Sequence, residues 1–160
     1  MLSKNINKYL IFILFFICIA LIAAYFIQYS LDYQPCKLCI YERIPYFISI
    51  ILLIVILLNP KYRKITLLIL SIVFLSSVFL SFYHFGIEQG FFIESFVCES
   101  ESLSKSLSKE QLLEQLKQNN ISCKDVSFTI LGLSLAAINM VLSFILSLVF
   151  LILFIDYRKN

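Results

Sequence analysis

Four long apolar runs, separated by polar stretches, dominate the pattern of this chain. They extend over about residues 9–28, 40–58, 65–85 and 127–155. A helix of about 20 apolar residues crosses a bilayer core of about 30 Å, so each run is long enough to span a membrane. The pattern therefore predicts an all-α membrane protein, a four-transmembrane-helix bundle forming a single domain over residues 1–160.

Two of the runs leave an alternative open. The first could belong to a cleaved signal peptide, because a basic head precedes it and Ala23-Ala24 offers a small-residue site. Its apolar core is longer than the roughly 7–15 residues of a signal, which favours a retained helix. The second run is long enough only if its helix starts near Ile40, ahead of Pro45, where a kink is expected.

The composition excludes an ordinary soluble domain. Hydrophobic residues make up 61% of the chain and charged residues only 14%, whereas globular domains carry about 25% charged residues. A soluble fold of this composition would expose large apolar patches, so the membrane is the solvent that the sequence indicates.

The basic residues predict the orientation of the four spans. Positively charged residues collect in the cytoplasmic loops of membrane proteins. The head, the turn at 59–64 and the tail hold one acid, Asp156, and seven basic residues: Lys4, Lys8, Lys61, Arg63, Lys64, Arg158 and Lys159. Both termini are therefore predicted to be cytoplasmic, with outer, periplasmic loops at about 29–43 and 86–126.

A short amphipathic surface helix is expected in the second periplasmic loop. Ser108 and Gln111 have the spacing of a capping box, and Leu112, Leu113 and Leu116 follow on one face. Such a helix would lie on the membrane with its leucines inward. The alternative is a mobile loop with leucines at these positions by chance.

Of five cysteines, four fall in the predicted outer loops. Cys18 lies deep in the first apolar run and is expected to be an inert buried thiol. Cys36, Cys39, Cys98 and Cys123 would all lie on the side where a bacterial cell keeps disulfides oxidised. Four cysteines allow three disulfide connectivities, and the sequence does not choose among them.

Cys36 and Cys39 form a C-x-x-C pair at the start of the second run. Such a pair is a thiol–disulfide couple or half of a metal site. A helix N-terminus near Cys39, and Arg43 one turn later, would both stabilise a thiolate there. Arg43 could also be a headgroup anchor, and the four loop sulfurs could together hold a zinc ion.

Cys98 and Cys123 are separated by 24 residues and, if bridged, close a loop in the second outer region. Such a bridge could be a static disulfide. Two pairs on one membrane face would also allow thiol–disulfide exchange, in which one pair reoxidises the other. His84, the single histidine, stands at the outer end of the third run, where it could be functional or could meet lipid headgroups.

Three motifs carry a resemblance to a known family. They are Cys36-Lys37-Leu38-Cys39-Ile40-Tyr41-Glu42-Arg43, Tyr83-His84-Phe85-Gly86-Ile87-Glu88-Gln89-Gly90, and Cys123 followed by Leu131-Gly132-Leu133-Ser134-Leu135-Ala136. With these motifs in order over nearly its whole length, the chain resembles the bacterial disulfide bond formation protein B (DsbB) family of quinone-linked inner-membrane oxidases.

The resemblance implies an enzyme, a quinone-dependent protein dithiol oxidoreductase. Cys98 and Cys123 would form the disulfide that oxidises a periplasmic, DsbA-like thioredoxin-fold partner, with Cys98 taking the mixed disulfide. Cys36 and Cys39 would reoxidise that pair and pass two electrons to ubiquinone or menaquinone. Cys39 would face the quinone as a thiolate, Arg43 would bind the quinone, and His84 would lie near the same pocket.

Two other classes of protein compete with this interpretation. One is a membrane metal-binding module built on the four loop cysteines, and metal analysis separates it from an oxidase. The other is a structural membrane protein with a static loop disulfide, in which Cys→Ser changes would alter stability but no electron flow. The type of quinone, the identity of the partner and the oligomeric state are left open by the sequence.

Overall fold

The computed structural model describes residues 6–93, 123–124, 129–130 and 132–159. Four stretches of helix in these residues are long and apolar enough to cross a membrane, as the sequence predicts. They are α1 (Ile6–Ser30), α2 (Lys37–Tyr41) continued by α3 (Ile44–Leu58), the 3-10 turn η2 (Pro60–Tyr62) continued by α4 (Arg63–Glu88), and α6 (Leu135–Lys159). The amphipathic helix predicted around Ser108 lies outside the described residues.

The second span is broken two residues before Pro45. Helix α2 begins at Lys37, earlier than the predicted Ile40, and ends at Tyr41, while α3 starts at Ile44. A proline ring clashes with the carbonyl four residues earlier and cannot donate a hydrogen bond to it. That carbonyl belongs to Tyr41, so the break falls where the proline requires it.

The fourth span starts later than the predicted residue 127. Strands β1 (Thr129–Ile130) and β2 (Leu133–Ser134) form an antiparallel pair in front of it. Gly132, with φ +82°, occupies the turn between them, a conformation that favours glycine. The Ser134 hydroxyl accepts a hydrogen bond from the Ala137 N–H at 3.2 Å, an N-cap contact that fixes the start of α6 at Leu135.

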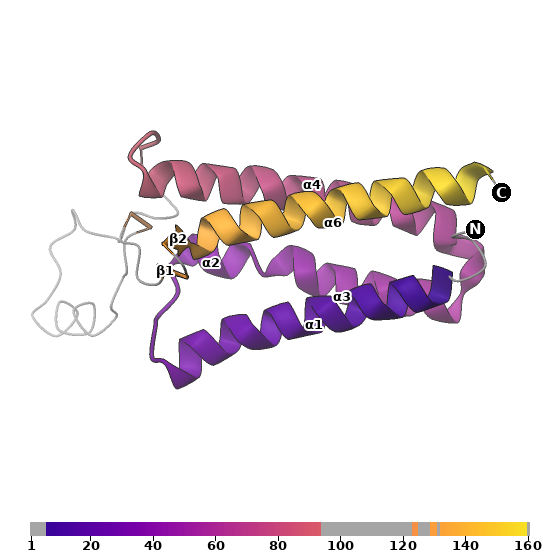
Figure 1. Ribbon diagram of the computed structural model, residues 1–160, viewed down its shortest axis with the longest axis horizontal. Helices are drawn as coiled ribbons and strands as arrows, with labels where there is room; N and C mark the ends of the chain where they lie inside the picture. Colours follow the sequence, from indigo (N-terminus) through magenta and orange to yellow (C-terminus); the bar gives the residue numbers. More distant parts are fainter. Residues whose placement is uncertain (1–5, 94–122, 125–128, 131, 160) are drawn as a thin grey trace, which may run out of the picture.

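The helices pack as a bundle in which α4 and α6 lie side by side along their length (Figure 1). Two reciprocal hydrogen bonds join these helices, from the Ser71 hydroxyl to the Ser147 carbonyl at 3.1 Å and from the Ser147 hydroxyl to the Ser71 carbonyl at 3.0 Å. Small serines let two helix backbones approach closely, and their hydroxyls link helices inside a membrane.

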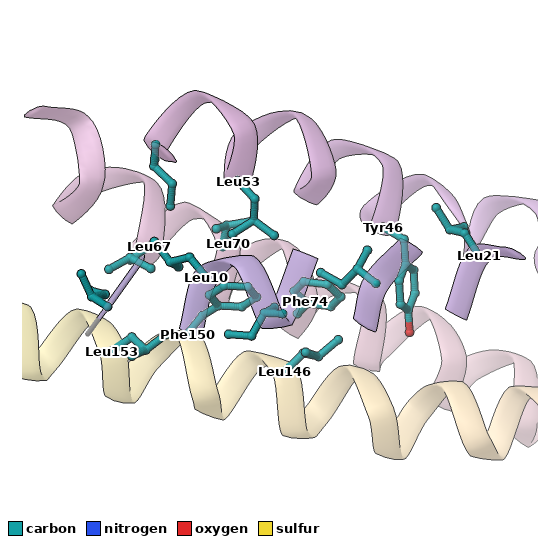
Figure 2. Close-up of a cluster of buried hydrophobic side chains, with 14 residues drawn as sticks. Leu10, Leu21, Tyr46, Leu53, Leu67, Leu70, Phe74, Leu146, Phe150 and Leu153 are labelled. Carbon is teal, nitrogen blue, oxygen red and sulfur yellow. The ribbon is translucent and has the colours of Figure 1, made fainter. Parts of the chain in front are cut away.

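The apolar core lies in the half of the bundle nearer the termini. Figure 2 shows its side chains converging from α1, α3, α4 and α6. The Phe74 ring stacks on Phe150 at 5.6 Å between centroids and meets the edge of Tyr46 at 5.4 Å. Both termini lie at the same end of the bundle (Figure 1), which leaves the C-x-x-C motif, the strands and the end of α4 together at the opposite end.

Gly86 fixes the path of the chain after α4. The Phe91 and Phe92 N–H groups donate to the Gly86 carbonyl at 2.8 and 3.2 Å. The Phe92 ring occupies the space that a Cβ at Gly86 would need. A larger residue would therefore displace the ring that covers this end of α4.

Candidate active site

Cys36 and Cys39 stand at the start of α2 with their sulfurs 2.8 Å apart, both as free thiols. Cys36 is the N-cap residue of α2, and its sulfur accepts a hydrogen bond from the Cys39 N–H at 3.2 Å. The sequence predicts a helix N-terminus near Cys39, and the structure places Cys39 in the first turn of α2, with Cys36 as the N-cap. The N-cap is where a short helix offers unpaired N–H groups to an anion.

His84 reaches the thiol pair from α4. Its Nε2 lies 3.4 Å from the Cys36 sulfur, and its Nδ1 lies 2.8 Å from Glu42 Oε1. Because a carboxylate accepts, Nδ1–H donates to Glu42 and Nε2 is left facing the thiols. Only 2% of His84 is exposed, which excludes the interpretation that it meets lipid headgroups.

The contacts of Cys36 favour its thiolate. The hydrogen bond from the Cys39 thiol is the largest cause that lowers its pKa, and the His84 ring adds to it. Burial acts in the opposite direction, and the pKa of Cys36 falls from 9.0 to about 5. A thiolate is the nucleophile in thiol–disulfide exchange, so Cys36 is prepared for that chemistry.

A buried polar network extends from Glu42 into the bundle. Asn139 Nδ2 donates to Glu42 Oε2 at 2.9 Å and to the Ser81 hydroxyl at 2.7 Å. The Tyr46 hydroxyl donates to Asn139 Oδ1 at 2.5 Å. Glu42 is only 6% exposed, and a buried carboxylate needs such partners. The network therefore fixes Glu42, and through it the orientation of the His84 ring.

A cavity of about 290 Å³ opens beside Cys39. Its walls are mostly apolar and come from α1, the segment before α2, the α2–α3 region and α6: Ala20, Leu21, Ala23, Ala24, Ile27, Gln28, Tyr33, Gln34, Pro35, Cys39, Glu42, Arg43, Tyr46, Leu135, Ile138, Asn139 and Leu142. On α1 the three alanines and Ile27 follow helical spacing along one face. The alanine side chains are small, and the space beside them forms part of the cavity.

Arg43 lines this cavity together with Cys39. Its Nη1 donates to Gln28 Oε1 at 2.6 Å, and its guanidinium lies over the Tyr25 ring at 4.7 Å from the centroid. The sequence suggests a direct role for Arg43 in stabilising Cys39. In the structure the guanidinium contacts Gln28 and Tyr25 of α1 and lies in the cavity wall. His84 is not among the lining residues and lies behind the thiols, against Cys36.

Cys123 lies beside the same thiol pair. It is 2% exposed and disulfide-bonded. It shares a buried cluster with Cys36, Leu38 and Ile87. Cys98 lies outside the described residues. Because Cys123 is held in a disulfide here, it offers no thiolate to a zinc ion, and the four-sulfur site considered from sequence does not form in this state.

Three residues of the site are missing from the candidates chosen by sequence. Glu42 lies three residues after Cys39, in the motif that ends at Arg43, and Glu88 lies in the motif around His84. Asn139 is an uncharged polar residue inside the fourth apolar run. A polar side chain at such depth is a signal of function that could have identified it.

Comparisons with known proteins agree with this geometry. The model of the family described as "Disulfide bond formation protein DsbB" matches residues 7–153. A relative from Rickettsia prowazekii (strain Madrid E), named "Uncharacterized protein RP370", is 36% identical over 144 residues, which covers 89% of this chain and 83% of the relative. No solved structure matches the chain.

Proposed function

The chain belongs to the DsbB family of disulfide bond formation proteins, and on that premise we propose that it oxidises a soluble thiol protein and passes the electrons to a membrane quinone. Family membership and the four apolar helices make it a membrane protein of disulfide oxidoreductase type. The finer parts of the proposal are the quinone, the partner and the path between them.

One observation carries the proposal: the C-x-x-C pair stands between Cys123 and an apolar cavity. Cys36 packs in the buried cluster that contains Cys123, whereas Cys39 lines the cavity with Arg43. Electrons can therefore enter the pair from one side and leave it on the other. A merely stabilising disulfide would require neither the cavity nor a second dithiol next to Cys123.

The proposed exchange step combines these contacts with the role that the family resemblance implies for Cys98. The partner's thiolate attacks the Cys98 sulfur, the Cys98–Cys123 bond breaks, and Cys123 leaves as a thiolate. Cys123 then attacks the Cys36 sulfur of an oxidised C-x-x-C pair, and Cys39 leaves with the electron pair. When the partner's second thiol has displaced Cys98, Cys98 resolves the Cys123–Cys36 bond. The result is one new disulfide in the partner and a reduced Cys36–Cys39 pair.

The residues around the cavity fit a quinone ring. Its walls are apolar, and the Arg43 guanidinium and the Gln28 amide stand in them as hydrogen-bond donors for a carbonyl oxygen. A bound quinone would accept two electrons and two protons as the dithiol becomes a disulfide. Cys39 would present its sulfur to the ring, and ubiquinone and menaquinone both have the required carbonyls.

The His84–Glu42 pair can hold the proton that Cys36 gives up. His84 Nε2 faces the Cys36 sulfur at 3.4 Å, and Glu42 stabilises a protonated ring through Nδ1 at 2.8 Å. We therefore assign His84 to proton handling beside Cys36 and Arg43 to the quinone side of the pair.

The partner and the location follow from the same proposal. A DsbA-like thioredoxin-fold protein of the periplasm would deliver the electrons, and the bundle would lie in a bacterial inner membrane. The bias of basic residues toward the termini supports placing the cysteines on the periplasmic side. Both termini lying at one end of the bundle agrees with this placement (Figure 1).

The decisive experiment is quinone reduction by the purified protein in detergent, driven by a reduced DsbA-like protein. We expect turnover with ubiquinone or menaquinone, its complete loss in Cys39→Ser and in Cys98→Ser, and its retention in Cys18→Ser. Cys18 belongs to α1 and is the matched control because it takes no part in the path. A folded wild-type sample that turns over neither quinone would contradict the proposal.

A further inference from the structure

Three metal-ligating atoms converge at the reduced thiol pair. The Cys36 and Cys39 sulfurs and His84 Nε2 all lie within 4.8 Å of one another. The two sulfurs are 2.8 Å apart, and the Cys36 sulfur is 3.4 Å from Nε2. Cys36 caps α2, Cys39 lies in α2 and His84 lies in α4, so these two helices fix the positions of all three side chains.

These atoms match the ligand set and the dimensions of a zinc site. Zinc binds cysteine sulfur at about 2.3 Å and histidine nitrogen at about 2.0–2.1 Å in a tetrahedron, which places ligand atoms roughly 3.5–3.8 Å apart. The Cys36–His84 separation already agrees with that spacing. The two sulfurs need to part by about 1 Å, which a small side-chain rotation provides.

The hydrogen bond on the other nitrogen of the His84 ring is of the kind that a zinc-bound histidine makes. A zinc-bound histidine usually donates its other N–H to a carboxylate, which fixes the ring. His84 Nδ1 makes this contact with Glu42, and Asn139 in turn donates to Glu42 Oε2 at 2.9 Å. Nε2 is thereby directed at the sulfurs.

Glu88 supplies an independent sign that a cation fits here. Its carboxylate is one helical turn after His84, with Oε1 3.8 Å from Nε2 and only 6% of the side chain exposed. Its Oε2 is buried without a hydrogen-bond partner among the described residues. A buried carboxylate oxygen without a partner is costly, and a cation coordinated by the neighbouring groups would compensate for it.

We propose that the reduced Cys36–Cys39 pair and His84 bind one zinc ion, with Glu88 at or beside the fourth position. The thiols release their protons as zinc binds, and no electrons move because zinc has a single oxidation state. Oxidation of the pair to a disulfide removes both thiolates and releases the metal. If the proposed function holds, zinc therefore retains the pair in its reduced form and stops electron flow.

The test is a zinc titration of the reduced, chelator-stripped, full-length protein in detergent, in competition with a chromophoric chelator. We expect one zinc per chain for the reduced wild type and none after the pair is oxidised. His84→Gln and Glu42→Gln should each weaken binding by about 10–100-fold, while Cys18→Ser should leave it unchanged. Cobalt in place of zinc should give sulfur-to-metal charge-transfer bands.

Each outcome of the zinc titration tests the metal site independently of the oxidase assay, because no quinone or partner is present. Equal binding before and after oxidation, or undiminished binding in a folded His84→Gln variant, would overturn the site. The comparison of redox states uses the wild-type chain alone, so it stands even if a variant fails to fold. A protein that binds zinc but turns over no quinone would keep this site and refute the proposed function.

Discussion

At the scale of the residue, the two cysteines of the C-x-x-C motif differ because their neighbours differ. Cys36 caps α2, contacts His84 and packs in the cluster with Cys123. Cys39 faces the cavity with Arg43. The same pair of thiols thus places one sulfur against Cys123 and His84 and the other in the wall of a cavity. This division follows from the N-cap position, which turns the Cys36 sulfur back toward the Cys39 N–H.

The first prediction concerns the titration of Cys36 in the reduced, metal-free protein. Because the pKa of Cys36 is lowered to about 5, its thiolate should persist above that pH and be lost as the pH falls through it. The ultraviolet absorbance of the thiolate measures this directly. Cys39→Ala should raise the midpoint, because the Cys39 thiol is the largest cause that lowers the pKa, and His84→Gln should raise it as well.

Cys36→Ser is the control for this titration, since it removes the thiolate that is measured. Its absorbance should show no step near the midpoint of the wild type. A wild-type midpoint near 9.0, the ordinary value for a cysteine, would contradict the assignment of Cys36 as the activated thiol.

At the scale of the element, helix α1 decides whether a ligand can reach Cys39. Ala20, Ala23 and Ala24 open the cavity on one face of α1. The opposite face is apolar and exposed, as at Ile22 with 67% exposure, which suits contact with lipid. One helix therefore combines a lipid-facing side with a side that keeps space open next to a redox pair.

The second prediction is that Ala24→Leu blocks the cavity proposed to bind the quinone without affecting thiol exchange. Overfilling a packed site costs about 1–3 kcal/mol, so the KM for quinone should rise about 10-fold. Disulfide exchange between the partner and the cysteines, followed by thiol trapping, should keep its rate. Steady-state kinetics against quinone concentration provides the measurement.

Ile22→Phe is the matched control on the same helix. It enlarges a side chain on the exposed face of α1, away from the cavity, and the KM for quinone should stay unchanged. Equal effects of the two substitutions would show that the cavity does not hold the quinone.

At the scale of the whole molecule, the bundle separates its apolar core from its polar site. The phenylalanine and leucine cluster packs between α1, α3, α4 and α6 (Figure 2), while Glu42, His84 and Asn139 meet beside the C-x-x-C motif. At the end with the termini, the buried Arg63 donates from Nη2 to Asn7 Oδ1 at 2.8 Å. This asymmetry agrees with one face toward the cytoplasm and one toward the periplasm.

The third prediction tests that sidedness with a matched pair of single-cysteine variants in a cysteine-free chain. Leu31→Cys lies in the segment after α1, and Lys61→Cys lies in the turn η2 at the opposite end. A membrane-impermeant maleimide should label Leu31→Cys in cells whose inner membrane is intact. It should label Lys61→Cys only after that membrane is permeabilised, and the reverse pattern would invert the orientation.

The sequence by itself determined the number of membrane spans and the candidate thiol pair, because both depend on local properties. Span length follows from the run of apolar residues, and the C-x-x-C spacing lies within four consecutive positions. The break before Pro45 agrees with the kink that the sequence predicts. The later start of the fourth span follows from the strand pair β1–β2 and from Ser134, which caps α6.

Only the tertiary structure decided which groups surround the thiols, because those contacts join residues far apart in the chain. His84 is 48 positions from Cys36, and Asn139 is 97 positions from Glu42. The cavity likewise needs alanines of α1 to face Arg43 and α6. Helical periodicity indicates which face of each helix is apolar, but packing selects which polar residues meet. That selection placed Cys36 in one cluster with Cys123 and Cys39 in the wall of the cavity, the arrangement on which the proposed electron path rests.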